Sequence, residues 1–102
     1  MIRHIVLIRF RADVTEAQIA DIFAALPRLS AKLGVQHYAC GRSESPEQIE
    51  RGYMHGFTID FASWEALAAY AVDPDHKLFG GQLVAHAAGG IDGLLVFDLA
   101  VA

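Results

Sequence analysis

The chain has 102 residues, a length that fits a single domain spanning residues 1–102. It is 54% hydrophobic and 20% charged, which argues against an intrinsically disordered protein. Its net charge of −4 argues against nucleic acid and anionic membrane surfaces as partners. The single cysteine, Cys40, cannot close a disulfide within the chain, and no apolar run reaches the ~20 residues that span a bilayer. We therefore expect a soluble cytoplasmic protein, with Cys40 buried or in a strand and not a nucleophile.

The N-terminal segment 2–11 predicts a β-strand that is apolar on both faces. Alternation places His4, Val6 and Ile8 on one face and Ile5 on the other. A strand that is apolar on both sides must be covered on both sides. In so short a chain, helices can cover one side of the sheet, and a second subunit is expected to cover the other.

A helix is expected to begin after Thr15, because Thr15 is a good N-cap and Gln18 stands at the position of its capping-box partner. The residues that follow at helical spacing form one apolar stripe: Ile19, Ile22, Phe23, Leu26, Leu29 and Leu33. Pro27 lies inside this pattern and should kink the helix or split it in two. Gly34 should end it.

Two further strands are expected at residues 35–41 and 53–61, joined by the polar loop 42–52. In the second of these strands, one face carries His55, Phe57, Ile59 and Phe61. Its face is thus apolar apart from His55, as expected for a strand that covers a core.

Ser63 should cap another helix, which Pro74 ends, since the residue before a proline avoids the helical region. Trp64 is expected to anchor this helix in the core. Three further residues are expected on its inward face: Leu67, Ala68 and Ala71. A short helix at 76–88 and a last strand at 91–99 complete the chain.

The order strand, helix, strand, strand, helix, strand predicts an α+β fold of the ferredoxin-like split βαβ type (βαββαβ). Such a fold has a four-stranded antiparallel sheet with helices on one face. Its open, apolar sheet face predicts an isologous homodimer, in which two sheets pack face to face as a dimeric α+β barrel.

Five separated segments of the chain resemble the stress-responsive A/B barrel domain (Dabb) family. They are His4-Ile-Val-Leu-Ile-Arg-Phe10, Gly52-Tyr53-Met-His55, Phe61-x-Ser63-x-Glu65-Ala66-Leu67, Tyr70-x-x-x-Pro74-x-His76 and Val96-Phe97-Asp98. The resemblance covers nearly the whole chain and implies a dimeric α+β barrel, in agreement with the pattern of elements. The fold by itself supplies no chemistry.

A plant polyketide cyclase of this kind uses a tyrosine and a histidine in the same Tyr…Pro-x-His segment. The resemblance implies that Tyr70 and His76 hold those catalytic positions, and that His4 and His55 are two further pocket histidines. The chain departs from that cyclase at Leu26, where the cyclase has a tyrosine. Between sheet and helices we expect a binding pocket whose other lining residues are apolar: Val6, Ile8, Phe23, Phe57 and Phe79.

A histidine can take a proton from carbon next to a carbonyl, and a tyrosine hydroxyl can hold the resulting oxyanion. We therefore expect a cofactor-free lyase, cyclase or isomerase acting on a small, largely apolar, oxygenated molecule, with His76 as base. Two alternatives stay open: a non-catalytic, stress-related structural dimer and a cofactor-free monooxygenase. Imidazoles of His4, His55 and His76 would suit a metal, but their spacing matches no metal motif, so no metal is expected.

Overall fold

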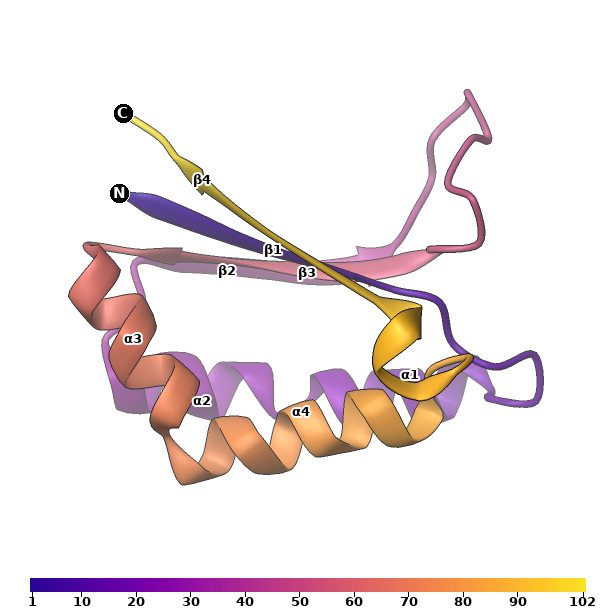
Figure 1. Ribbon diagram of the computed structural model, residues 1–102, viewed down its shortest axis with the longest axis horizontal. Coiled ribbons are helices and arrows are strands. Elements are labelled where there is room, and N and C mark those ends of the chain that lie inside the picture. Colours follow the sequence, from indigo (N-terminus) through magenta and orange to yellow (C-terminus); the bar gives the residue numbers. More distant parts are fainter.

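In a computed structural model that describes residues 1–102, a four-stranded antiparallel sheet carries helices on one face only (Figure 1). The strands are β1 (Ile2–Ile8), β2 (His37–Arg42), β3 (His55–Phe61) and β4 (Leu94–Ala100). The helices are α1 (Glu16–Phe23), α2 (Leu26–Leu33), α3 (Trp64–Val72), α4 (Pro74–His86) and the short 3₁₀ helix η1 (Gly90–Gly93). The sheet order β2-β3-β1-β4 is that of the predicted ferredoxin-like fold, which is confirmed. None of these helices combines the length and the apolar character needed to cross a membrane.

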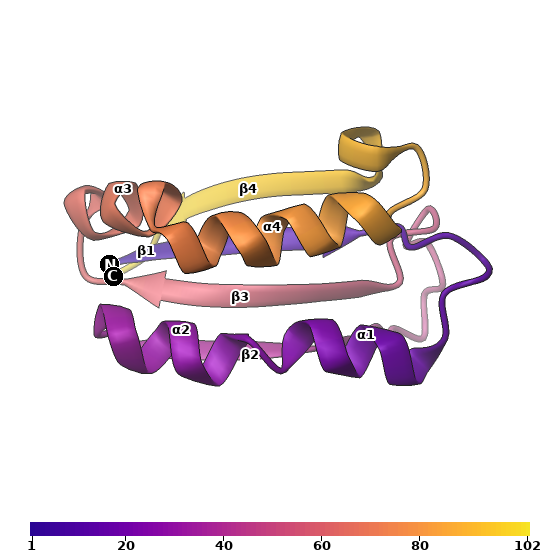
Figure 2. The same cartoon turned by 90° about the horizontal axis from the view of Figure 1, so that it is seen from below.

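The predicted capping and breaking residues act where the sequence places them. The Thr15 hydroxyl accepts the backbone N–H of Gln18 at 3.1 Å, and the Gln18 side-chain oxygen accepts the Thr15 backbone N–H at 2.8 Å. Pro27 splits the long apolar stripe, because it lies in the first turn of α2 after α1 has ended. Gly34 ends α2 with φ 63°, in the left-handed region that favours glycine. These residues set the two short helices end to end along β2 and β3 (Figure 2).

The expected inward face of α3 is partly wrong. Trp64 is 56% exposed, and Ala68 and Ala71 are exposed as well, whereas Leu67 packs on the core and Tyr70 is buried. The reason is the position of α3, which lies at one end of the helical layer (Figure 2) and meets the sheet along a narrow stripe. Composition alone made Trp64 a core candidate, but the orientation of the helix leaves it outside.

The core lies between the inner face of the sheet and the helices. Strand register places His4, Val6 and Ile8 of β1 opposite Ile59, Phe57 and His55 of β3. Fourteen buried residues form one apolar cluster: Val6, Ile8, Ile19, Ile22, Phe23, Leu26, Leu29, Phe57, Ile59, Phe61, Tyr70, Phe79, Leu83 and Ala87. Burial of each large side chain in such a cluster contributes roughly 1.5–3 kcal/mol, which is the main term that favours this fold.

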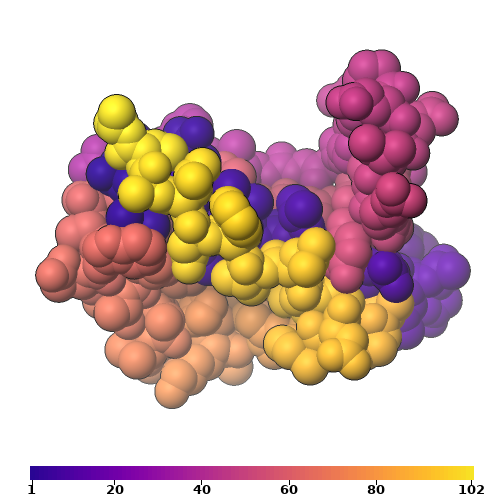
Figure 3. All heavy atoms as spheres, turned by 45° about the horizontal axis from the view of Figure 1, so that its top comes forward, coloured from indigo at the N-terminus to yellow at the C-terminus, as the bar shows by residue number.

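The other face of the sheet has no cover. Apart from Arg3, which is paired with Asp60 of β3, the side chains on it along β1 and β4 are apolar, and the exposed apolar ones include Leu7, Leu95, Phe97 and Leu99. We call these four residues the open sheet face. The loop of residues 43–54 rises on the same side, as Figures 1 and 3 show, while both chain ends lie close together at the opposite end of the sheet.

The edge strand β4 also extends beyond the helical layer. Figure 2 shows α4 lying across β1, with β4 outside it. Val96 therefore stays 59% exposed although it pairs with Val6, whose side chain is buried. The inner face of the sheet is closed over β1 and β3 and open over β4, which leaves one side of the core accessible.

Candidate functional site

The turn that joins α3 to α4 is held by charged side chains. The Asp73 carboxylate accepts the backbone N–H of Asp75 at 2.9 Å and so caps α4, whose first turn begins with Pro74. Lys32 of α2 bonds both carboxylates, with nitrogen–oxygen distances of 2.9 Å, and its hydrogen bond lowers the pKa of Asp73. Asp73 and Asp75 flank Pro74 in this turn, and they fix where the next residue, His76, lies.

His76 is half-buried in the first turn of α4, with its ring on that of Tyr70 at 4.1 Å between centroids. Its Nδ1 donates to the backbone carbonyl of Ala71 at 3.2 Å, so a neutral ring keeps its lone pair on Nε2. A Cβ added at Gly80 would lie 4.0 Å from this Nε2, so the glycine leaves space beside it. Burial lowers the pKa of His76 and favours the neutral, proton-accepting form.

Tyr70 is 1% exposed, and its hydroxyl has no hydrogen-bond partner. Its ring packs against those of Phe61, at 5.1 Å, and His4, at 5.7 Å, as well as against His76. Burial raises the pKa of Tyr70, so the phenol remains a hydrogen-bond donor. A buried hydroxyl without a partner is uncommon in folded proteins and calls for an explanation.

His4 is buried beside Tyr70 and is oriented by a carboxylate. Its Nδ1 donates to the Asp98 Oδ1 at 2.6 Å, across the register of β1 and β4, where the two residues stand opposite. The sequence did not identify Asp98 as a site residue, since pairing between residues 94 positions apart depends on strand register. The structure thus brings together three of the predicted site residues, His4, Tyr70 and His76, and adds Asp98.

The other predicted lining residues surround this cluster or lie apart from it. Phe57 packs on His4 at 6.4 Å and on Phe79 at 5.2 Å, while Val6 and Ile8 are buried in the core. None of the cavities in the structure is lined by His4, Val6, Ile8, Tyr70 or His76. In the single chain, the predicted pocket between sheet and helices is therefore filled with side chains at this point.

Phe23 and His55 belong to a different place, a cavity of about 430 Å³ between α1 and β2. Phe23 packs on Phe57 at 6.1 Å, and Phe57 packs on Phe79. These three phenylalanines form an aromatic wall between the cavity and the Tyr70–His76 pair. The single pocket expected from the sequence is thus divided into two regions.

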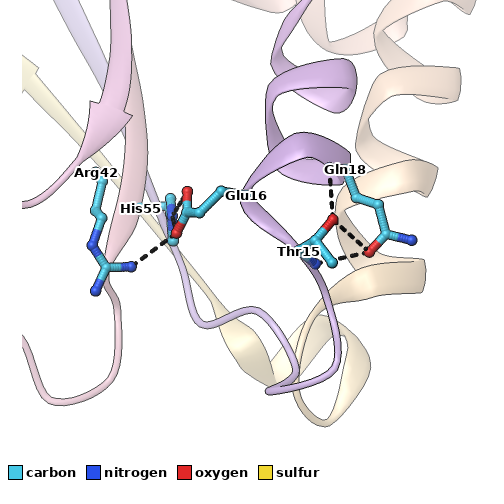
Figure 4. Close-up of polar contacts among 5 residues, drawn as sticks. All are labelled: Thr15, Glu16, Gln18, Arg42 and His55. Carbon is cyan, nitrogen blue, oxygen red and sulfur yellow. Dashed lines mark hydrogen bonds and ion pairs between the residues drawn. The ribbon is translucent and has the colours of Figure 1, made fainter.

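His55 is 7% exposed and is hydrogen-bonded to Glu16 of α1 (Figure 4). Its Nε2 lies 3.0 Å from both carboxylate oxygens of Glu16, and the Arg42 Nη1 donates to the same carboxylate at 3.0 Å. The hydrogen bond from His55, with Arg42 nearby, lowers the pKa of Glu16. Glu16 and Arg42 were not identified from the sequence, because an α1–β2 contact cannot be inferred from helical or strand periodicity.

The chemistry available at these two places is that of acids and bases. No group of three or more His, Cys, Asp or Glu side chains is arranged to hold a metal ion. Cys40 was expected to be buried or in a strand. It lies in strand β2, and its side chain is exposed. Burial of part of its surface raises the pKa of the thiol, which disfavours the nucleophilic thiolate.

A four-stranded antiparallel sheet in the order β2-β3-β1-β4, with helices on one face, places the chain in the class of ferredoxin-like α+β domains. Residues 2–101 match the stress-responsive A/B barrel domain family, and the chain belongs to this family. It is similar to the stress-response A/B barrel domain-containing protein HS1 of Arabidopsis thaliana, with 30% identity over 95% of this chain and 86% of that protein. It is also similar to olivetolic acid cyclase of Cannabis sativa, with 26% identity over 78% of this chain and 79% of that protein.

Among solved structures, a ferredoxin-like protein of unknown function from a Jannaschia species superposes with a TM-score of 0.91. The two chains are 36% identical, and the match covers 98% of each. That protein is described as dimeric. The family and the fold expected from the sequence are both confirmed by these similarities.

Proposed function

We propose that this protein is a cofactor-free acid–base catalyst that binds a small, largely apolar, oxygenated molecule and acts at carbon next to a carbonyl. The observation that carries this proposal is the Tyr70 hydroxyl, buried without a partner beside the oriented ring of His76. A buried unsatisfied hydroxyl costs free energy in the unliganded protein. A substrate oxygen that accepts a hydrogen bond from this hydroxyl would remove the cost on binding, so the unsatisfied group favours a bound ligand.

Each polar side chain has a role in the proposed reaction. The Nε2 of His76 takes the proton from carbon, because Nδ1 is held by the Ala71 carbonyl and the lone pair is on Nε2. The Tyr70 hydroxyl donates to the enolate oxygen that develops. His4, held by Asp98, packs edge-on against the Tyr70 ring at 5.7 Å and positions it. The products follow from protonation, ring closure or cleavage at the enolate, so cyclase, isomerase and lyase outcomes share this first step.

Substrate entry in this proposal requires side-chain movement. No cavity reaches Tyr70, but His76 is half-buried and the sheet is open along β4 beside Asp98. For a substrate to reach the hydroxyl, the side chains packed on the Tyr70 ring have to move, and these are His4, Phe61 and His76. The similarity to olivetolic acid cyclase supports a cyclase-type reaction, and this chain carries Tyr70 and His76 in the segment that the resemblance concerns.

We propose that two copies of the chain associate through the open sheet face. Leu7, Leu95, Phe97 and Leu99 form an exposed apolar patch there, and such patches mark association surfaces. The loop of residues 43–54 rises on the same side, where it can border a second sheet (Figure 3). The dimeric state of the Jannaschia protein supports this arrangement.

A ligand panel tests the proposed function. Thermal unfolding is followed with small keto acids, lactones and phenols, for the native chain and for a Tyr70→Phe/His76→Ala double variant. A ligand at ~100 times its Kd should stabilise the native chain by about 2.7 kcal/mol and the variant by much less. The matched control is His86→Ala, since His86 also lies on α4 with its Nδ1 on a backbone carbonyl, that of Gln82, at 2.7 Å. Equal stabilisation of the native chain and the double variant would contradict binding at the pair.

A second candidate is a non-catalytic, stress-related dimer. The filled space around Tyr70 favours it, because the aromatic cluster packs as a core would and no cavity opens on it. This alternative predicts that the Tyr70→Phe/His76→Ala variant is much less stable than the native chain. It also predicts that no compound of the panel changes the unfolding temperature.

A further inference from the structure

Helix α3 is apolar on its outer face as well as on the face that packs on the core. Of its nine residues only Glu65 is charged, and all the others are apolar. Leu67 and Tyr70 face the core, whereas Trp64 is 56% and Val72 69% exposed. The outer faces of the other helices carry charged side chains: Asp21 on α1, Arg28 and Lys32 on α2, and Asp75 and Lys77 on α4. A helix that is apolar all round is normally buried, so the outer face of α3 calls for a cover that the single chain does not provide.

Three exposed apolar residues of α3 form one row along the helix, which we call the α3 row: Trp64, Ala68 and Val72. Their spacing of four residues places them one above the other, about 6 Å apart along the axis, on the side away from Tyr70. The row has a large side chain at each end and a small one in the middle. Rows of this spacing are the ridges through which two helices most often pack.

The α3 row is complementary to itself. Trp64 lies as far before Ala68 as Val72 lies after it, so a two-fold axis at Ala68 brings each Trp64 to Val72 of the partner subunit when the helices run antiparallel. The two copies of Ala68 then meet at the axis, where their small side chains let the helices approach closely. The two copies of Glu65 lie on opposite sides of the axis, about 9 Å apart along the helix, so their like charges do not meet.

The dimer proposed above leaves the α3 row uncovered. Helix α3 lies on the opposite side of the sheet from the open sheet face, at one end of the helical layer (Figures 1 and 2). Neither Trp64 nor Val72 lines any cavity of the structure. The row is therefore a helix ridge without a hollow for a small molecule, and a second helix fits it better.

We infer that the α3 row is a second self-association surface, which pairs α3 antiparallel with α3 of another copy and so joins dimers into larger assemblies. Tryptophan is among the side chains that contribute most to binding at protein interfaces, and Trp64 is available for this role. Two helices of nine residues make a contact below the roughly 1,200 Å² of stable interfaces, so the association should be weak. It is independent of the proposed catalysis, because Tyr70 faces the core.

Trp64 is the only tryptophan of the chain, so its fluorescence reports on this surface directly. Emission and sedimentation are measured from about 10 µM to about 1 mM protein, the range of weak association. The emission should move to shorter wavelength as species heavier than the dimer form. Val72→Asp should weaken this association about tenfold or more and leave the dimer intact, because it buries an unpaired carboxylate against Trp64. The matched control is Leu78→Asp on α4, since Leu78 is 72% exposed and lies outside the row.

A cysteine at the proposed axis tests the antiparallel orientation. In a Cys40→Ser background, Ala68→Cys should form a disulfide between two copies on mild oxidation, about tenfold or more faster than Ala17→Cys on the exposed side of α1. The inference is overturned if the native chain and Val72→Asp have the same Trp64 emission at every concentration, or if Leu78→Asp weakens association equally. Equal cross-linking rates at positions 68 and 17 would overturn it too. So would a shift in emission seen only with phosphatidylcholine vesicles, which would make the row a lipid-binding surface.

Discussion

The substitution Tyr70→Phe should stabilise the protein and lower the proposed activity at the same time. The hydroxyl of Tyr70 is buried and has no hydrogen-bond partner, and leaving such a group unsatisfied costs about 1–3 kcal/mol. Removing it leaves a void of roughly one atom, which costs about 0.3 kcal/mol at the usual dependence on cavity volume. The net expectation is a gain of about 0.7–2.7 kcal/mol in the free energy of unfolding.

In a domain of this size, such a gain raises Tm by about 4–8 °C per kcal/mol. Urea and thermal unfolding should be measured at one fixed protein concentration, because association of the subunits makes apparent stability depend on it. The control is Tyr53→Phe. The half-buried ring of Tyr53 lies under the Arg9 guanidinium, 4.8 Å from it, and this substitution should change the free energy of unfolding by less than about 0.5 kcal/mol. Destabilisation by Tyr70→Phe of about 1 kcal/mol or more would refute the reasoning, since the hydroxyl would then have a stabilising partner.

Three further predictions concern protonation, packing and association. Burial holds the pKa of His76 below the ordinary value of ~6.5. The stability that neutral His76 contributes is therefore complete above pH ~6.5, and it is lost as the pH falls through the lower pKa of the folded state. In that acidic range the free energy of unfolding of the native chain should fall more steeply with pH than that of His76→Gln. Equal pH dependence of the two proteins would contradict this prediction. Gly93→Ala should cost about 1–3 kcal/mol in urea unfolding, because its Cβ would lie 2.5 Å from a neighbouring carbonyl oxygen, whereas Gly81→Ala, with nothing within 4 Å, should not destabilise. If the chain forms the proposed dimer, Phe97→Asp on the open sheet face should convert it to monomers in light scattering and Val72→Asp on α3 should not; a dimer that survives Phe97→Asp would place the interface elsewhere.

Local signals in the sequence predicted the elements of the fold well. Thr15 and Ser63 cap their helices, and Pro27 splits the first apolar stripe, because capping and the loss of a backbone donor depend on neighbouring residues only. Alternation along residues 2–8 separated the inner face of β1 from the open sheet face for the same reason. These features need no knowledge of how distant segments meet.

The polar partners of the site residues depend on contacts between segments that are far apart in the sequence. His4 meets Asp98 because β1 and β4 pair in one register, and a shift of one residue would put Asp98 on the other face. His55 meets Glu16 because the fold brings the first residue of β3 next to the first residue of α1. Trp64 was misplaced for the same reason, since the orientation of α3 on the sheet is a property of the whole fold. The family resemblance located Tyr70 and His76, but not the closed space around them.

The central claim is that Tyr70 and His76 act together on a proton next to a carbonyl. The most direct test is exchange of that proton for deuterium in D₂O, followed by NMR on a keto acid or lactone that stabilises the native chain. Exchange should be fast with the native chain and with His86→Ala, and should fall by about 10²–10⁴-fold with His76→Ala, the usual contribution of a general base. Tyr70→Phe should lower it as well while the dimer stays folded. Exchange at the native rate with a folded His76→Ala variant would contradict the account.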